Sequence, residues 1–236
     1  MLVLALETAT ERASAVVAEG DVELAAWRDA THQDLCRRLA SEVSGVLSAA
    51  GQSFERLDLI AVGLGPGAFT ALRVGLATAK GIALARALPL VGVSSLEAMC
   101  YQVRGQLSGL VCPILDARRG EVYGAIYRAA EDGFERVEAE FAVGPTELAS
   151  KLRSAAAEVT VFGHLDRTPT DAIAQALGDA GTLWRERTVV PDALAVAQLG
   201  RRRYAAEGRA DLASVRPIYV RMSYAEERFD IDLGLR

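Results

Sequence analysis

The chain has 236 residues, of which 51% are hydrophobic, and it carries a formal net charge of −5; a chain of this size and composition can bury a large core. Disordered and collagen-like classes are therefore excluded. The acidic balance also argues against a free-standing nucleic-acid-binding protein, because such proteins gain most of their affinity by neutralising phosphates.

Apolar runs and turn residues predict an α/β chain that opens with an antiparallel hairpin. Residues 2–6 form an apolar run that ends in Glu7, and a second run at 13–18 returns before a turn at 19–21. The expected elements that follow are a strand at 22–27, a helix over 32–50, a strand at 57–62, a helix ending near residue 88, a strand at 90–93 and a helix opening at Ser94. Strands that alternate with helices in this way favour mostly parallel pairing, apart from the antiparallel strands that open each half.

A glycine-rich turn precedes the second of these helices. The segment 63–75 reads GLGPGAFTALRVG, and its glycines and proline fix an unusual backbone before a helix N-terminus, which can offer free N–H groups to an anion. Every fourth residue is small, which places one ridge on the helix: Gly67, Ala71, Gly75, Ala79 and Ala83. A ridge without side-chain bulk lets a second helix approach closely. The segment therefore predicts an anion cradle, a packing seam, or both.

The opening hairpin recurs in the second half of the chain. Residues 111–115 form an apolar run that ends in Asp116, and a return run follows at 122–127. Glu7 and Asp116 are related by a shift of 109 residues, which also relates 14–17 to 123–126. We therefore predict a duplicated lobe. The expected domains are 1–105 and a smaller 106–236, the latter with a strand at 159–162, a helix at 192–207, a strand at 215–222 and a C-terminal tail.

Each of the two predicted α/β lobes opens with a hairpin, and the first strand of each hairpin ends in an acid. This arrangement is typical of the paired RNase H-like lobes of actin, Hsp70 and the sugar kinases (ASKHA). In that architecture the two corners face a cleft for nucleotide phosphates and a metal, and the acids act through the metal or its waters. The candidate nucleotide-cleft residues are Glu7, Thr8, Thr10, Asp116 and Arg118. A simpler alternative stays open, in which each carboxylate accepts hydrogen bonds from local backbone N–H groups.

Five blocks of the sequence together resemble the bacterial TsaB (YeaZ) family over nearly the whole chain. They are LALETAT at 4–10, GPGAFTALRVG at 65–75, GVSSL at 92–96, DARRGEVY at 116–123 and PIYVR at 217–221. The resemblance implies a non-catalytic dimerisation and scaffold subunit of the machinery that makes N6-threonylcarbamoyladenosine in ANN-decoding transfer RNAs. It implies pairing with and activation of the catalytic paralogue TsaD, contact with the ATPase TsaE, a homodimer in the absence of partners, and contact with transfer RNA only through the complex.

The residues give no spacing evidence of a catalytic centre. The paralogue's His-x-x-x-His metal signature is absent, since the only histidines are His32 and His164, and no GxxxxGK[ST] phosphate loop occurs. We therefore assign no catalytic residue, no metal ligand and no required cofactor, and leave open weak ATP or ADP binding in the cleft or at the partner interface. The rival hypothesis is an enzyme acting alone, either a nucleotide-dependent phosphotransferase or a peptidase.

The expected partner interface is the small-residue ridge together with Leu39 and Val43 of the preceding helix. If this face is external, Gly75→Leu should abolish association and leave the monomer folded. The alternative is that the ridge packs only inside its own lobe. The sequence also lacks a basic leader segment and a long uncharged apolar stretch, so we expect a cytoplasmic protein without membrane association. The three cysteines have no CxxC spacing, and we expect them to be buried free thiols.

Overall fold

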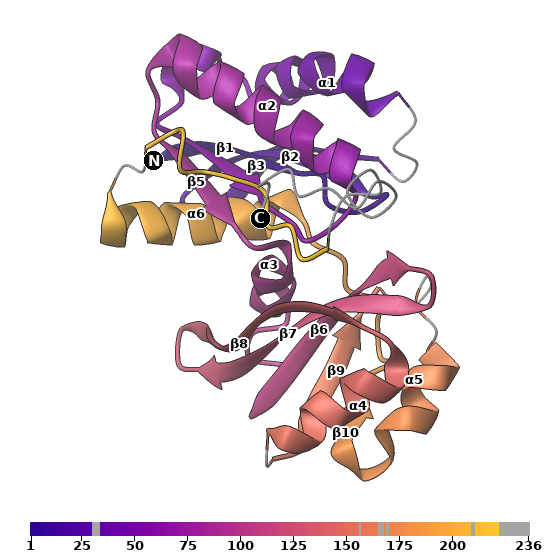
Figure 1. Cartoon of the computed structure of the whole chain (residues 1–236). Coiled ribbons are helices and arrows are strands. Elements are labelled where there is room, and N and C mark those ends of the chain that lie inside the picture. The colour runs from indigo at the N-terminus through magenta and orange to yellow at the C-terminus, as the bar shows by residue number, and fades with distance from the viewer. Residues whose placement is uncertain (30–33, 156, 165–167, 169, 209–210, 222–236) are drawn as a thin grey trace. The chain divides into compact units, whose positions relative to one another are not determined.

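The structure is a computed structural model, and it describes residues 1–29, 34–155, 157–164, 168, 170–208 and 211–221 (Figure 1). The chain forms two compact units. The first comprises Met1–Ala98 and Pro191–Ile218, and the second comprises Met99–Val190 together with residues 219–221. This division differs from the expected one at residue 105, because the chain returns to the first unit at Pro191.

The first unit contains a five-stranded sheet of order β3-β2-β1-β4-β5. Its strands are β1 (Leu2–Glu7), β2 (Ala13–Glu19), β3 (Val22–Asp29), β4 (Leu59–Gly63) and β5 (Leu90–Val93). The first three strands pair antiparallel, whereas β1, β4 and β5 run parallel. All residues of β1 and β4 are buried, as expected for central strands covered on both faces. The predicted pairing pattern is confirmed.

Helices cover both faces of this sheet (Figure 1). On one face, α1 (Leu35–Ala49) packs against β2 and β3, and α2 (Phe69–Arg86) packs against β1, β4, β5 and α1. On the other face, α6 (Ala193–Glu207) packs against β1, β2, β4 and β5. A Cβ atom at Gly200 of α6 would lie within 3.0 Å of the Ala61 side chain, so a residue without a side chain lets this helix lie close to the sheet. A single 3₁₀ turn, Phe54–Arg56, precedes β4.

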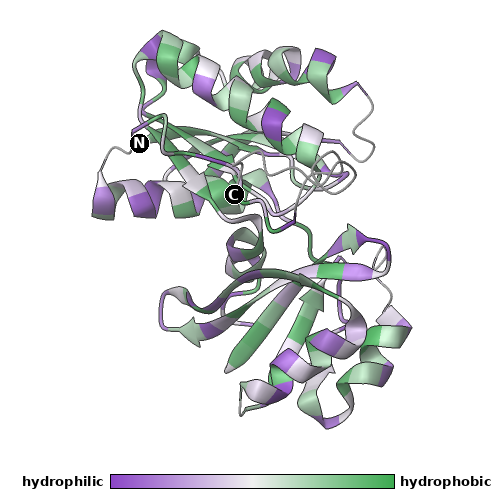
Figure 2. Ribbon diagram, viewed as in Figure 1, coloured by the Kyte–Doolittle hydropathy of each residue, from purple (hydrophilic) through white to green (hydrophobic). Residues whose placement is uncertain are grey.

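The second unit repeats the topology of the first. Its strands β6 (Leu110–Arg118), β7 (Glu121–Ala130), β8 (Gly133–Val143), β9 (Val159–Gly163) and β10 (Gly181–Leu183) lie in the order β10-β9-β6-β7-β8. Read in reverse, this order matches the first sheet strand for strand, which confirms the predicted duplication and the two-lobed α/β fold class. The central strands β6 and β9 are hydrophobic along much of their length (Figure 2). The helices α4 (Pro145–Ser154) and α5 (Thr170–Leu177), followed by the 3₁₀ turn Gly178–Ala180, complete the core of this unit.

Predicted element ends are mostly confirmed within two or three residues, with one wrong element. The helix α6 begins after its N-cap Asp192 and ends at Gly208, as the sequence indicates. Residues 215–221 form no strand. The backbone N of Ile218 donates a loop hydrogen bond to the carbonyl oxygen of Leu64 at 2.8 Å. The tail at 223–236 and His32 lie outside the described residues. The short helix α3 (Ser95–Gln102) opens at the predicted position.

The cysteine side chains and the arginine side chains of α6 lie in different surroundings. Cys36 is exposed on α1, whereas Cys100 and Cys112 are buried, so the prediction of buried thiols is wrong for Cys36. In the arginine run of α6, Arg201 pairs with Asp21 and Arg203 pairs with Glu97, so these two charges are neutralised locally. Across the described part of the chain, no helix combines the length and apolarity needed to cross a membrane.

Candidate functional site

The acid at the end of β1 faces the interior of the first unit. Glu7 has no exposed surface. Its Oε1 accepts a hydrogen bond from the backbone N of Ala9 at 2.7 Å, and its Oε2 accepts one from Ser95 Oγ at 2.7 Å. The Ser95 hydroxyl oxygen in turn accepts from the backbone N of Gly65 at 3.2 Å. The carboxylate is therefore linked, through Ser95, to the glycine loop.

Burial dominates the electrostatics of Glu7. Removal from water disfavours the charged form and raises the pKa of Glu7 from 4.5 to about 7, while the hydrogen bonds from Ala9, Ser95 and Thr8 act in the opposite direction. The negative charge of Asp192 adds to the rise. Near neutral pH this carboxyl group is therefore present in both its neutral and its charged form.

The rest of the corner receives the glycine loop and the first turns of α2. Thr8 Oγ1 donates to the carbonyl oxygen of Ala71 at 2.9 Å, and the Ala9 carbonyl oxygen accepts from the backbone N of Ala68 at 2.8 Å. A Cβ atom at Gly67 would overlap the Ala9 carbonyl group, and one at Gly75 would overlap the Thr8 hydroxyl group. We call the residues 7–9 and Ser95 the α2 seat, because loop and helix fit against them without space for another side chain.

These contacts change the reading of the first-lobe cleft residues. Glu7 and Thr8 are 0% and 1% exposed and make their contacts within the unit. Thr10 is 9% exposed, and its hydroxyl oxygen accepts from the backbone N of Arg12 at 3.2 Å. The loop N–H groups of Gly65 and Ala68 already have partners in the chain, so they are not part of a free anion cradle. The alternative in which the carboxylate accepts a local N–H group is confirmed for Glu7.

The second corner has the same local hydrogen bond but a different setting. Asp116 Oδ1 accepts from the backbone N of Arg118 at 2.8 Å. Arg118, Arg119 and Gly120 all have positive φ, at 66°, 55° and 78°, and a left-handed backbone costs a non-glycine residue about 1–2 kcal/mol. The Arg118 side chain is 66% exposed and lies 3.5 Å from the Asp116 carboxylate. This corner therefore presents a strained, basic hairpin tip.

The residues predicted to form a partner interface lie inside the first unit. Ala79 and Ala83 are fully buried, Ala71 is 6% exposed, and Leu39 and Val43 are 1% exposed. All five belong to one core cluster with the strands of the sheet. Gly67 and Gly75 fit against the α2 seat. An external face built from this ridge is therefore wrong, and the alternative of packing within the lobe holds.

The opposite face of α2 carries a second small ridge that the sequence interpretation missed. Ala77, Gly81 and Ala85 are exposed, and Gly81 lies about 200° around the helix from Ala79. The sequence does contain a signal for this ridge, because its small residues have the same four-residue spacing as the buried ridge and lie two positions further along the chain. Sequence reasoning also missed Ser95 as the partner of Glu7, because the serine was interpreted only as part of a helix cap.

Metal ligands are not clustered in the described part of the chain. No group of three or more His, Cys, Asp or Glu side chains among these residues is placed to hold a metal ion. His164 is buried, at 6% exposure, in the second unit.

Comparisons with known proteins agree over most of the chain. Residues 29–176 match the family model described as TsaD, tRNA N6-adenosine threonylcarbamoyltransferase. The chain is 34% identical to the tRNA threonylcarbamoyladenosine biosynthesis protein TsaB of Escherichia coli (strain K12), over 69% of this chain and 71% of that protein. It is 28% identical to TsaB of Bacillus subtilis (strain 168), over 97% and 98% respectively.

Solved structures show the same relationship. YeaZ from Pseudomonas aeruginosa superposes with a TM-score of 0.75 at 26% identity, covering 92% of this chain and 99% of that one. An ROK hexokinase from Thermus thermophilus superposes with a TM-score of 0.50 at 14% identity, covering 87% and 100%. The hexokinase likeness shows the fold alone, and it places the chain among the ASKHA folds.

Proposed function

The chain belongs to the TsaB (YeaZ) family of threonylcarbamoyladenosine biosynthesis proteins, and we propose that it is the non-catalytic subunit that pairs with and activates a TsaD-like paralogue during modification of ANN-decoding transfer RNA in the cytoplasm. Two relatives are named for threonylcarbamoyladenosine biosynthesis. TsaB of Bacillus subtilis matches over 97% of this chain and 98% of its own length, and TsaB of Escherichia coli matches over 69% and 71%. The match of residues 29–176 to a TsaD model supports a common origin of the two subunits.

One observation carries the non-catalytic assignment. Glu7, the acid that would face a metal or nucleotide in an active ASKHA enzyme, is fully buried and bonded to Ala9 and Ser95. Its neighbour Thr8 is bonded to α2. Two of the first-unit residues expected at a nucleotide cleft therefore bond to partners within their own unit, which supports a structural use of the corner.

The outer faces of α1 and α2 supply the docking surface in this proposal. Both helices lie on the same face of the first sheet and contact each other (Figure 1). Their exposed residues are mostly small: Ala40, Ser41, Ser44, Gly45 and Ser48 on α1, and Ala77, Gly81 and Ala85 on α2. Leu84 lies beside the α2 ridge with 74% of its surface exposed. We call this set the α1–α2 face.

Two glycines of the α1–α2 face have no internal explanation. A Cβ atom at Gly45 or Gly81 would meet nothing within 4 Å, so packing within the chain does not require glycine there. Glycine inside a helix costs about 1 kcal/mol relative to alanine. A close approach by helices of a partner would explain both residues, because backbone contact needs positions without side chains.

The occupant proposed for this face is the TsaD-like paralogue, and a second copy of this chain takes the same place when the paralogue is absent. Duplicated folds offer similar helical faces, so the homodimer and heterodimer compete for one surface. A TsaE-like ATPase and transfer RNA join only the assembled complex. Any ATP or ADP bound would then be held at the second corner or by the complex, because Glu7 and Thr8 have internal partners.

Reconstitution tests the proposed function. Purified TsaD-like and TsaE-like partners should modify transfer RNA only when this chain is added, and the chain alone should neither turn over ATP nor cleave peptides. Gly81→Leu should remove both association and activation and leave the fold intact. Modification that proceeds without this chain, or metal-dependent ATP turnover by the chain alone, would replace the scaffold assignment with the enzyme alternative.

A further inference from the structure

Building on the proposed docking role, we infer that Thr8, Glu7 and Ser95 are positioning residues for partner binding: they hold the glycine loop and the first turns of α2 and so set the orientation of the α1–α2 face. In this chain the corner that an ASKHA enzyme uses for phosphates serves as a support for the docking helix. None of the three side chains touches the partner.

Thr8 provides the direct connection to the helix. Its hydroxyl group donates to the carbonyl oxygen of Ala71, in the first turn of α2, at 2.9 Å, and the residue is 1% exposed. Gly75 lies one turn further on, where a Cβ atom would overlap the Thr8 hydroxyl group. Contact on two successive turns fixes both the depth and the rotation of the helix, because the helix can neither move closer to β1 nor turn without a clash.

Glu7 and Ser95 hold the loop that leads into the helix. Gly65 is bonded twice to Ser95: its backbone N donates to the serine hydroxyl oxygen at 3.2 Å, and its carbonyl oxygen accepts from the serine backbone N at 2.8 Å. Glu7 Oε2 accepts from the same hydroxyl group at 2.7 Å. The acid therefore orients the Ser95 hydroxyl group, which leaves the serine oxygen free to accept from the loop.

A small movement at the seat is amplified at the docking surface. The helix α2 has 18 residues and is therefore about 27 Å long. A tilt of about 5° about one end moves the other end by about 2 Å, which exceeds the tolerance of a close-packed helix contact. Gly81 lies on the same rigid helix as Ala71 and Gly75, so a loosened first turn misplaces the outer ridge.

The test compares two buried hydroxyl groups that fasten helices to the same sheet. Thr8→Val removes the contact with α2 and keeps the side-chain shape, and Thr8→Ser restores the hydroxyl group. Ser14→Ala is the matched control, because Ser14 Oγ accepts from the backbone N of Ala193 at 2.9 Å and so fastens α6 on the opposite face. The measurements are the Kd for the TsaD-like paralogue by titration calorimetry, and amide hydrogen exchange of α2 in the isolated full chain.

Thr8→Val should weaken binding about 5- to 10-fold and speed exchange in the first turns of α2, as expected for loss of one buried hydrogen bond. Thr8→Ser should return the Kd to within about twofold of the wild-type value, and Ser14→Ala should leave it there. Equal weakening by Thr8→Val and Ser14→Ala would overturn the inference, because general destabilisation would then explain the loss. Unchanged binding and unchanged α2 exchange in Thr8→Val would overturn it as well.

Failure of the proposed function gives a different result. If Gly81→Leu leaves binding of the paralogue intact, the α1–α2 face is not the docking surface, and the docking part of the inference falls with it. Exchange of α2 in the isolated chain does not depend on any partner. Faster exchange in Thr8→Val alone still supports the seat, and unchanged exchange rejects it.

Discussion

Glu7 and Asp116 each accept a hydrogen bond from the backbone N–H group two residues further along the chain, at 2.7 Å from Ala9 and 2.8 Å from Arg118. Glu7 is the last residue of β1, and Asp116 lies two residues before the end of β6, the equivalent strand of the second sheet. Their surroundings have nevertheless diverged, because Glu7 is fully buried whereas the Asp116 side chain is 18% exposed. The first corner is buried against the glycine loop and α2, and the second lies at the tip of a hairpin.

The buried acid makes the stability of the chain depend on pH. The pKa of Glu7 is about 7 in the folded state, whereas its ordinary value is 4.5. At a pH between these two values, the folded state keeps a proton that the unfolded state has lost. This contribution to stability is therefore fully present below about pH 4.5 and is lost as the pH rises through 7, by about 3 kcal/mol in all. Glu7→Gln, which mimics the neutral acid, should remove this dependence.

Urea unfolding at pH 5, 6, 7 and 8 measures the effect. Relative to Glu7→Gln, the wild-type chain should lose about 2 kcal/mol of unfolding free energy between pH 5 and pH 8. Parallel profiles for the wild type and Glu7→Gln would show that Glu7 does not titrate in this range.

Replacement of glycine by alanine should change the stability of the fold in opposite directions at two positions of α2. Gly75→Ala places a Cβ atom against the Thr8 hydroxyl group and should destabilise the fold by about 1–3 kcal/mol through strain. Gly81→Ala meets nothing within 4 Å and should stabilise the fold by about 0.5–1 kcal/mol, because alanine is the better helix former. Denaturant unfolding of the two variants decides the matter, and effects of the same sign would contradict the assignment of inner and outer faces.

The sequence could not identify the inner face of α2 for a physical reason. Small residues recur every fourth position on both sides of the helix, through Ala79 and Ala83 on the buried side and Ala77 and Gly81 on the exposed side. The helix is therefore only weakly amphipathic, and periodicity alone does not distinguish the two faces. By contrast, α1 has large apolar residues on one side only, and Leu39 and Val43 are buried there.

The duplicated hairpins show a similar limit. The shift of 109 residues correctly relates strands and corners, but it predicts that Asp116 pairs with Tyr123, whereas Asp116 pairs with Val122. An irregularity between Asp116 and Arg118 moves the register by one residue. Arg118 has a left-handed backbone at this irregularity, and arginine gives no sequence signal for that conformation.

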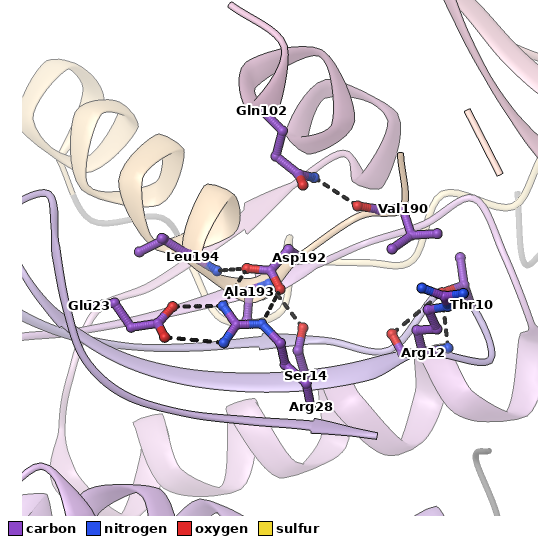
Figure 3. A network of polar contacts seen from close by, with 10 residues as sticks. All are labelled: Thr10, Arg12, Ser14, Glu23, Arg28, Gln102, Val190, Asp192, Ala193 and Leu194. Atoms are coloured by element: carbon purple, nitrogen blue, oxygen red, sulfur yellow. Dashed lines mark hydrogen bonds and ion pairs between the residues drawn. The ribbon is translucent and has the colours of Figure 1, made fainter. Parts of the chain in front are cut away.

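The N-terminus of α6 is held by a polar network that can be divided by mutation (Figure 3). Asp192 Oδ1 accepts from the backbone N of Leu194 at 2.8 Å, and Arg28 bonds both Asp192 and Glu23. Asp192→Asn keeps the helix cap and loses the ion pair, so it should cost at most about 1 kcal/mol at this partly exposed site. Asp192→Ala loses both and should cost about 1–2 kcal/mol. Equal costs would show that the cap contributes nothing.

The return of the chain to the first unit predicts how truncation acts. A chain ended after Val190 lacks α6, which covers β1, β2, β4 and β5 on one face. Apolar residues on that face, including Ala61, would then be exposed to water, at a cost of about 25 cal/mol for each Å². Amide exchange in β1 and β4 should become fast, while β6 and β9 of the second unit keep their protection. A chain ended after Arg221 retains α6, so β1 and β4 should stay protected. If β1 and β4 stay protected without α6, residues 1–98 form a stable unit without the returning segment.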